Sequence, residues 1–264
     1  MQAAIDAASD GATIHICAGT YGRLDGGSVA SINSRSLTLI GAGQGEDGTI
    51  LDGGGSQNEN PVITIIDAPT TVELRDLRIT GASSRYAFGG GVGAYRSGLT
   101  LLRTTLTNNS ASQGAGVYFS SPGKALSITD STFSGNDAVG YGGGAIFLND
   151  GTVQVSGTTV TQNSTAGAGG GLYMVGTLTL TDSVISRNAA SYRGGGIYNV
   201  GTITFNTTQV TLNTSPWAAG VWNQGTVNVG SGSGITNNTV GNCVDDNAGT
   251  GCPPAWSQHG CRMP

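Results

Sequence analysis

Charged residues and long apolar runs are scarce in this chain of 264 residues. Asp, Glu, Lys and Arg make up 10% of the sequence, Lys124 is the single lysine, and the net charge is −5. This balance excludes nucleic acid as the main partner, because neutralising phosphates requires many basic groups. Sparse charge also argues against a long disordered tail. No apolar run approaches the roughly 18 residues of a membrane-spanning helix, so we expect no membrane insertion.

Glycine is abundant instead, with 46 residues. Because glycine is unfavourable inside helices, this number argues against a helical protein. Residues 1–11 lack the basic and apolar regions of a secretory signal. Cys243, Cys252 and Cys261 crowd the last 22 residues, and such dense cysteine usage is typical of oxidising compartments. We therefore expect an extracellular or cell-surface protein whose export signal is not present in this chain.

A repeat of 25–27 residues runs through the sequence. Each copy has an apolar residue, then Ser or Thr, and an Asn three positions after the apolar residue, as in TLTNN at 105–109. An earlier copy, RITGA at 78–82, has Ala82 in place of the asparagine. The asparagines recur at steps of 27, 27, 25, 25 and 25, and they are Asn109, Asn136, Asn163, Asn188, Asn213 and Asn238.

Each repeat predicts about three short strands, for example LTL at 99–101 and, after a glycine cluster, GVYF at 116–119. A leucine-rich repeat would need a helical return segment, which these glycine-rich stretches disfavour. The better solution is a parallel β-helix in which each strand pairs with its counterpart one coil away. Like residues then stack about 4.8 Å apart. The asparagines would form a ladder of amide hydrogen bonds, and Asn also tolerates the left-handed conformation of a sharp corner.

The expected β-helix occupies residues 1–242. An amphipathic helix at 2–9 would cover the first coil, and the segments 13–21, 36–40 and 62–66 would belong to early coils. About nine coils would give a rod roughly 43 Å tall. Residues 243–264 are predicted to be a cysteine-containing tail or cap.

The sequence resembles the right-handed parallel β-helix proteins of pectin-lyase-like architecture, whose first coil is similar to TIHICAGTY at 13–21. Its repeats look like the polymorphic outer membrane protein repeats of bacterial surface adhesins, with their GGAI signature at 143–146 and FxxN at 133–136. Other copies replace the Phe by Leu, Val or Ile. The resemblance covers residues 2–242 and implies an all-β, single right-handed parallel β-helix. It does not decide the activity, because this fold carries enzymes, adhesins and fibres.

Catalytic groups are not evident in the sequence. Glycoside hydrolysis needs two carboxyl groups at a set separation, and calcium-assisted elimination needs several acidic ligands. The acidic residues are scattered, the Asp245–Asp246 pair lies in the cysteine-rich tail, and His15 and His259 are far apart. One column is predicted to be a solvated ion ladder: Asp76, Arg103, Asp130, Gly157 and Asp182. We expect no catalytic residues, no metal and no cofactor.

Aromatic residues recur one coil apart at Tyr118, Ile146, Tyr173, Tyr198 and Trp222. Alternate residues of a strand point to opposite faces of the sheet, and the sequence does not determine whether these rings point into the core or towards solvent. An inward column would be a buried stack, whereas outward rings at Tyr118, Tyr173, Tyr198 and Trp222 could bind sugar faces or pack against a neighbouring rod.

A row of hydroxyl residues is a second candidate surface. It consists of Thr100, Ser127, Thr179 and Thr204, interrupted by Gln154 and Asn228, and it is similar to the rows of ice-binding solenoids. Solvent-facing β-propensity explains the row equally well.

The cysteines divide between the two ends of the predicted rod. Cys17 belongs to the first coil, and a disulfide requires Cα atoms within about 7 Å, so at most one pair forms among Cys243, Cys252 and Cys261. The odd thiol, or Cys17, would be free and buried or would join rods end to end. A zinc site that includes His259 is an alternative, although the spacing matches no standard finger.

These patterns together favour a non-catalytic extracellular or cell-surface rod with a structural or adhesive role. Its expected partners are further copies of itself, through the end coils or the side, or surface glycans. The alternative is a carbohydrate-active lyase or hydrolase, or a carbohydrate-binding module, of the same fold; ice binding is third.

Overall fold

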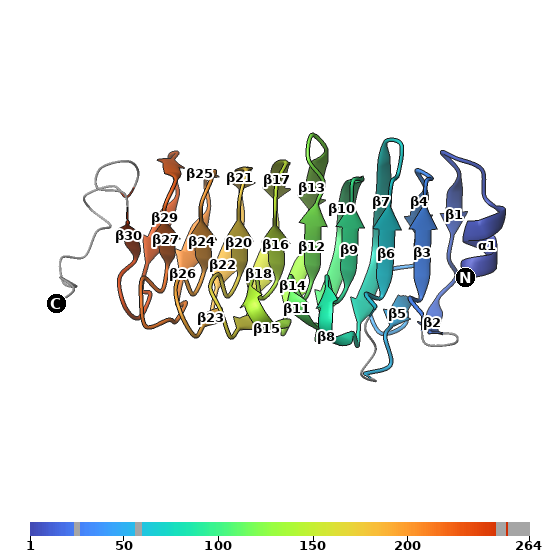
Figure 1. Cartoon of the computed structure of the whole chain (residues 1–264), viewed down its shortest axis with the longest axis horizontal. Helices are drawn as coiled ribbons and strands as arrows, with labels where there is room; N and C mark the ends of the chain where they lie inside the picture. Colours follow the sequence, from blue (N-terminus) through green and yellow to red (C-terminus); the bar gives the residue numbers. More distant parts are fainter. Residues whose placement is uncertain (24–26, 56–59, 247–251, 253–264) are drawn as a thin grey trace.

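The structure is a computed structural model that describes residues 1–23, 27–55, 60–246 and 252. Within these residues the chain forms a rod of stacked coils, with one short helix at the N-terminal end and 30 strands (Figure 1). The strands pair in parallel with their counterparts one coil away, as β10 does with β13. The predicted all-β parallel β-helix is confirmed.

Three sheets run along the rod, and they contain 16, nine and five strands of the described residues. The largest, sheet A, consists of β1 (Thr13–His15), β2 (Gly19–Gly22), β4 (Thr38–Ile40), β5 (Thr49–Asp52), β7 (Thr71–Thr80), β10 (Gly98–Thr107), β13 (Ala125–Thr129), β14 (Thr132–Ser134), β17 (Thr152–Ser156), β18 (Thr159–Thr161), β21 (Thr177–Thr181), β22 (Val184–Ser186), β25 (Thr202–Asn206), β26 (Gln209–Thr211), β28 (Thr226–Val229) and β29 (Gly234–Thr236).

Sheet B consists of β3 (Ala30–Asn33), β6 (Ile63–Ile66), β9 (Val92–Tyr95), β12 (Val117–Ser120), β16 (Ile146–Leu148), β20 (Leu172–Met174), β24 (Ile197–Asn199), β27 (Val221–Asn223) and β30 (Cys243–Asp245). Sheet C consists of β8 (Ser83–Phe88), β11 (Ser110–Gln113), β15 (Asp137–Gly142), β19 (Ser164–Thr165) and β23 (Ala189–Ala190). The nine strands that the described residues give to sheet B span about eight turns, close to the predicted nine coils.

One continuous hydrophobic core fills the rod from Ile5 to Cys243. Alternate residues of each strand point into it, so Val117 and Phe119 are fully buried while Tyr118 between them points outward. A buried side chain of this size contributes about 1.5–3 kcal/mol. The register therefore fixes which residues each coil offers to the surface.

Left-handed backbone conformations mark the corners of the coils. The column predicted to be an ion ladder is one such corner, with φ of 46° to 56° at Asp76, Arg103, Asp130, Gly157 and Asp182. Asp and Gly suit this column because they tolerate the left-handed conformation. Within the described chain one ion pair occurs in this column, in which Arg103 Nε and Nη2 donate to the Asp76 carboxylate at 2.6 and 2.7 Å. The predicted ion ladder is therefore present at one step, between Asp76 and Arg103, and the left-handed backbone favours Asp and Gly at the other positions of the column.

The asparagine ladder is confirmed, and its side chains from Asn109 to Asn213 are buried along the interior of a second corner, while Asn238 at its end is half-buried. The Nδ2 group of Asn136 donates to Asn163 Oδ1 at 2.9 Å and to the carbonyl of Leu106 at 3.0 Å. Its Oδ1 accepts from the backbone N and the Nδ2 of Asn109 at 3.2 and 3.1 Å. The ladder contains the six predicted residues Asn109, Asn136, Asn163, Asn188, Asn213 and Asn238.

Asn242 ends the ladder, because its Oδ1 accepts from the Nδ2 of Asn238 at 3.2 Å. One expectation about this corner was wrong. The left-handed residue is the one before each ladder asparagine, with φ of 53° to 65° at Asn108, Gly135, Gln162, Arg187, Leu212 and Asn237. The ladder asparagines themselves stabilise the corner through hydrogen bonds.

The two ends of the rod are closed differently. Helix α1 (Gln2–Ala7) lies over the first coil, where the Gln2 amide exchanges hydrogen bonds with the Ser31 backbone on the edge strand β3, at 2.8 and 3.0 Å (Figure 1). At the other end a disulfide joins Cys243 to Cys252. These two cysteines are therefore not zinc ligands, and Cys261 and His259 lie outside the described residues.

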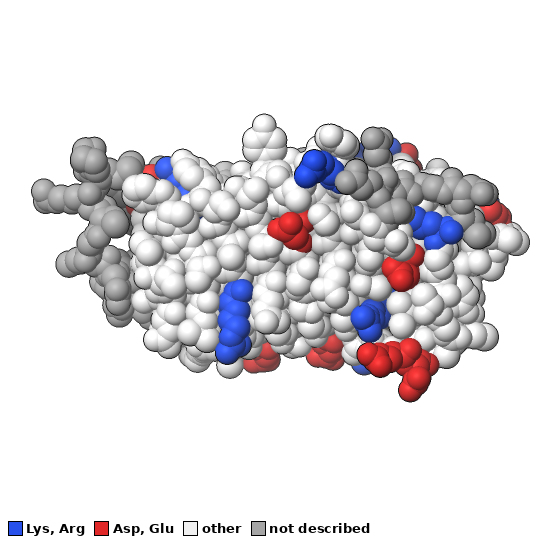
Figure 2. Space-filling view, turned by 90° about the horizontal axis from the view of Figure 1, so that it is seen from below, with Lys and Arg blue, Asp and Glu red and all other residues white. Residues whose placement is uncertain are grey.

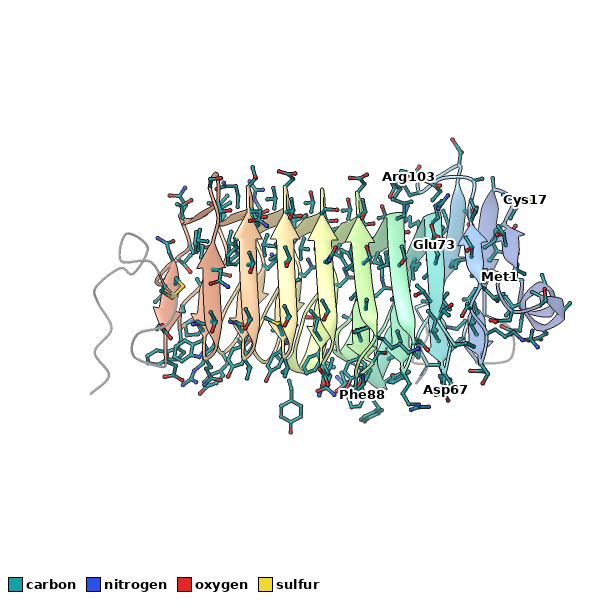
Figure 3. The ribbon with its side chains drawn as sticks, turned by 90° about the horizontal axis from the view of Figure 1, so that it is seen from above. Met1, Cys17, Asp67, Glu73, Phe88 and Arg103 are labelled. Carbon is teal, nitrogen blue, oxygen red and sulfur yellow. A yellow bond between two sulfur atoms is a disulfide. The ribbon has the colours of Figure 1, made fainter. Side chains whose placement is uncertain are left out.

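Cys17 is a free, exposed thiol at the helix end of the rod, far from the disulfide (Figure 3). The alternative in which Cys17 is buried is wrong, and a link between rods stays a prediction. Strand β30 continues sheet B past residue 242. The division into a β-helix over 1–242 and a tail over 243–264 also stays a prediction.

Candidate functional site

The aromatic column predicted from the sequence lies on the outer face of sheet B. Its register pairs Tyr118 with Phe147, and Phe147 with Tyr173. Ile146 is therefore not part of the column, because it pairs with Val117 and points into the core. The coil between Tyr118 and Phe147 is longer than the repeat period of the sequence. Counting by the period therefore pointed to Ile146, the residue next to Phe147.

Four rings of this column form a continuous stack, which we call the stacked column: Tyr118, Phe147, Tyr173 and Tyr198. Their centroids are 5.4, 4.6 and 4.8 Å apart and their planes lie within 6° to 19° of each other. Tyr118 and Phe147 are each 8% exposed. The rings cover one another's faces, so the stack has a structural role and leaves mainly ring edges for a ligand.

Burial raises the pKa of several hydroxyl groups along this column. The pKa of Tyr95, whose ring packs against Tyr118, rises to about 12 because of burial and the neighbouring Tyr118 hydroxyl. Burial also raises the pKa of Tyr173 and of Tyr198. The hydroxyls therefore remain neutral hydrogen-bonding groups at physiological pH.

Two other tyrosines beside the stacked column are exposed to solvent. Tyr141 is 79% exposed and Tyr192 is 50% exposed. The Ala168 amide donates to the Tyr141 carbonyl at 3.1 Å, and the Tyr192 amide donates to the Gly167 carbonyl at 3.0 Å. Tyr141, Gly167 and Tyr192 thus occupy neighbouring positions in three successive coils, with the glycine between the two rings.

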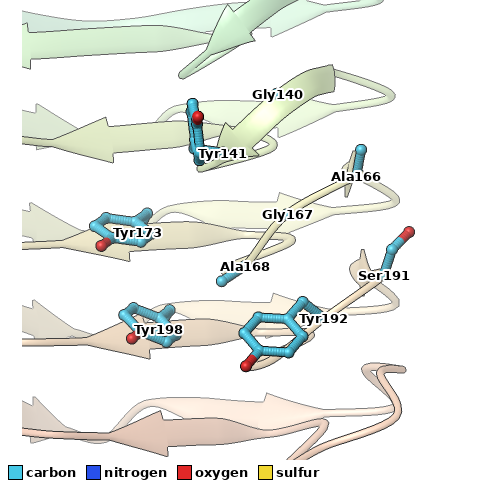
Figure 4. A pocket seen from close by; sticks show the side chains of 9 residues that line it. All are labelled: Gly140, Tyr141, Ala166, Gly167, Ala168, Tyr173, Ser191, Tyr192 and Tyr198. Carbon is cyan, nitrogen blue, oxygen red and sulfur yellow. The ribbon is translucent and has the colours of Figure 1, made fainter.

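These residues surround a depression of about 650 Å³, which we call the tyrosine slot (Figure 4). Its lining carries no charged side chain among the residues that the structure describes. Small residues separate the rings, and four tyrosines supply rings and hydroxyls. The lining consists of Gly140, Tyr141, Ala166, Gly167, Ala168, Tyr173, Ser191, Tyr192 and Tyr198.

A network around Arg193 supports the end of the slot nearer the C-terminus. The Arg193 guanidinium lies 4.5 Å from the Tyr192 ring centroid and 4.1 Å from that of Trp222. Cation–π contacts of this kind hold the ring of Tyr192 in place. The Tyr198 hydroxyl donates to Gln224 at 2.7 Å, and Gln224 donates to Asp246 at 2.9 Å.

Most described aromatic residues lie along this one edge, where sheet C meets sheet B. Phe119, Phe133 and Phe205 are in the core and Tyr21 lies near the helix end. We call the remaining described residues the aromatic stripe, and Figure 3 shows rings along the edge where Phe88 is labelled. The stripe consists of Tyr86, Phe88, Tyr95, Tyr118, Tyr141, Phe147, Tyr173, Tyr192, Tyr198, Trp217 and Trp222.

The model of a protein family described as "right handed beta helix region" matches residues 63–244, which is more than half of the chain. The chain belongs to the right-handed beta helix family. Comparison with curated proteins and with solved structures gives no match. Membership of the right-handed beta helix family establishes the handedness of the coils and does not assign an activity.

On the face that Figure 2 shows, most acidic side chains lie apart from one another, with one contiguous acidic patch at the lower right. Arg96 donates to both oxygens of Asp67 at 2.6 and 2.9 Å, which lowers the pKa of Asp67. Asp245 accepts from Asn223 at 3.3 Å, so the Asp245–Asp246 pair ends two hydrogen-bonded networks. In the searched, described part of the chain no group of three His, Cys, Asp or Glu could hold a metal ion.

The hydroxyl row lies on the outer face of sheet A in the expected register, from Thr100 through Gln154 to Asn228. A more regular column stands on the other half of sheet A. It consists of the Ser or Thr of each repeat motif and contains Thr80, Thr107, Ser134, Thr161, Ser186, Thr211 and Thr236.

The predicted aromatic column contains two lining residues of the slot, Tyr173 and Tyr198, but sequence reasoning missed the two exposed rings. Tyr141 and Tyr192 are 51 positions apart, about two periods, and this interval was the available signal. A buried ladder of hydroxyl groups was also missed. In this ladder the backbone amide of Thr104 donates to Ser131 Oγ at 3.1 Å, and the backbone amide of Ser131 donates to Thr158 Oγ1 at 3.3 Å. No helix among the residues searched is long and apolar enough to cross a membrane.

Proposed function

We propose that this right-handed β-helix is a non-catalytic, extracellular or cell-surface adhesive rod that binds glycans through its tyrosine slot. The observation that carries the proposal is the pair of exposed rings, Tyr141 and Tyr192, on either side of an uncharged depression. These two rings are open to a ligand, whereas Tyr118 and Phe147 of the stacked column are each only 8% exposed.

The chemistry of the slot matches that of a sugar. A pyranose ring has an apolar face of C–H groups and a rim of hydroxyls. The ring face of a tyrosine can pack against the C–H face of the sugar, and its hydroxyl can donate to or accept from the sugar hydroxyls. The slot also has the mixture of apolar lining and a few polar groups that is typical of small-molecule sites. Ser191 and four tyrosines, Tyr141, Tyr173, Tyr192 and Tyr198, are the lining residues with polar side chains.

A non-catalytic role is supported by the positions of the charged side chains. The lining of the slot contains no carboxylate or imidazole group that could act as acid or base. Asp246 is the carboxylate that the network around the slot includes, and it accepts from Gln224 and lies 4.0 Å from Arg193. An oxidising location is supported by the Cys243–Cys252 disulfide.

The test is retention of the purified protein on insoluble polysaccharides and on an array of neutral and acidic glycans. We expect wild-type protein to be retained, and Tyr141→Ala and Tyr192→Ala each to weaken binding about tenfold, as expected for the loss of one stacked ring. Tyr86→Ala is the matched control, because Tyr86 is 74% exposed and is not part of the slot lining.

Two results would overturn the proposal. Release of shortened oligosaccharides from a bound polysaccharide would identify an enzyme, the alternative function. Alternatively, sedimentation could show that Tyr141→Ala dissociates an oligomer while no glycan is retained by wild-type protein, and the stripe would then be a contact between rods.

Ice binding is a second candidate, favoured by the column of seven Ser and Thr residues from Thr80 to Thr236 within the described part of sheet A. Like residues at one-coil spacing give a flat and regular array. A thermal hysteresis assay tests it, with Thr161→Tyr as the disrupting variant and Tyr141→Ala as the control on the opposite candidate surface. Absence of hysteresis in wild-type protein would exclude this function.

A further inference from the structure

We propose that the ligand of the tyrosine slot is an extended chain of neutral pyranose sugars that lies parallel to the rod axis. This inference rests on the proposed glycan binding and adds the class and the direction of the ligand. Its basis is the placement of two exposed rings at corresponding positions two coils apart, with the small residues Ala166, Gly167 and Ala168 between them.

The spacing of the two rings favours a chain over a single sugar. Tyr141 and Tyr192 belong to coils separated by one intervening coil, so their backbones are roughly 10 Å apart along the axis. One pyranose ring that stacks on Tyr141 does not reach Tyr192. Two successive sugars joined by equatorial bonds have about this length, so an axial chain can contact both tyrosines at once.

The intervening coil keeps the floor of the slot open. Gly167 stands between the two tyrosines, and a Cβ atom there would lie 2.1 Å from the Tyr141 carbonyl oxygen. The backbones therefore approach too closely for any larger residue without displacement. The adjacent Ala166 and Ala168 carry only methyl groups. The large side chain that the intervening coil adds to the lining is Tyr173, which belongs to the stacked column and lies to the side of Tyr141 and Tyr192 (Figure 4).

The charges around the slot select a neutral sugar. The lining residues are uncharged, so a carboxylate or sulfate on the ligand would lose water without gaining a cation inside the slot. Arg193 is the nearest candidate cation. Its guanidinium is already placed over the Tyr192 and Trp222 rings and lies near Asp246. A net charge of −5 on the whole chain also disfavours acidic polymers.

The first experiment measures affinity by calorimetry against a series of neutral β-linked oligosaccharides from one to six sugars. We expect affinity to increase about tenfold or more between one sugar and the length that contacts both rings, and then to level off. Tyr141→Ala should reduce the affinity for long oligosaccharides to that for the short ones. Ala166→Trp, which fills the exposed floor, should also remove the length dependence, and Tyr86→Ala should retain it.

The outcomes separate this inference from the proposed function. An affinity that does not depend on length, with equal effects of Tyr141→Ala on one sugar and on six, would overturn the axial chain and leave glycan binding intact. Tighter binding of a uronic acid series would overturn the neutral class. If no glycan binds, the proposed function fails and the inference fails with it. Circular dichroism spectra of the variants check that each one is folded.

Discussion

Replacement of Asn163 by alanine tests the ladder on which the coil geometry depends. The Asn163 amide makes five hydrogen bonds in the protein interior. Its Oδ1 accepts from the backbone N and the Nδ2 of Asn136 at 3.0 and 2.9 Å. Its Nδ2 donates to Asn188 Oδ1, Phe133 O and Thr161 O at 2.9, 3.1 and 3.0 Å.

The expected cost follows from this geometry. A hydrogen bond contributes about 1 kcal/mol net, and a buried donor without a partner costs about 1–3 kcal/mol. Asn163→Ala removes five bonds and leaves the amide of Asn136 buried without its acceptor. We therefore expect the free energy of unfolding to fall by about 4–5 kcal/mol. Asn163→Asp keeps the shape but places an acceptor against the Phe133 and Thr161 carbonyls, so it should destabilise the protein at least as much.

Urea denaturation followed by circular dichroism measures this loss, and native-state hydrogen exchange locates it. The exchange measurement is needed because a stacked repeat can open locally near the substituted coil. The Asn136 amide proton should lose most of its protection. Asn228→Ala is the control, because Asn228 is exposed and its contact with Thr204 is 3.5 Å long, so its effect should stay within about 0.5 kcal/mol. Equal stability of Asn163→Ala and Asn228→Ala, with unchanged protection at Asn136, would refute the reasoning.

Two further predictions concern packing and pH. Gly144→Ala should destabilise the protein by about 1–3 kcal/mol in urea titrations, because the new Cβ would lie 2.1 Å from the Gly170 carbonyl oxygen. Gly45→Ala, with no atom within 4 Å, should be neutral, and equal effects would contradict the argument. Tyr95 has a folded-state pKa of about 12, above the value of about 10 in the unfolded chain. The neutral Tyr95 hydroxyl therefore contributes its full stability below about pH 10, and this contribution is lost as the pH rises towards 12. Melting temperatures of the wild-type protein should fall over that interval. They should fall less in Tyr95→Phe, which has no hydroxyl to ionise. An identical fall in Tyr95→Phe would contradict this assignment.

The sequence determined the fold of this protein because its information is local and repeated. An asparagine that recurs at steps of 25–27 residues identifies one coil, and stacked coils place each copy against the next. The ladder from Asn109 to Asn238 and the strand pairing of Leu99 with Leu126 both follow from that period. The disulfide between Cys243 and Cys252 was among the predicted pairings, whereas the choice between them required coordinates.

The tertiary structure decided which side chains point outward and which of them lie together on the surface. Whether a ring points inward depends on strand parity, and two additional residues in one coil place Phe147 rather than Ile146 in the outward stack. The slot depends on Gly167 lying between Tyr141 and Tyr192, residues from three coils whose proximity is set by stacking. Backbone conformation likewise favours Asp and Gly in the column at the left-handed corner, where an ion pair forms only between Asp76 and Arg103 among the described residues. A period fixes which coils are neighbours, whereas side-chain direction and corner geometry are properties of the folded backbone.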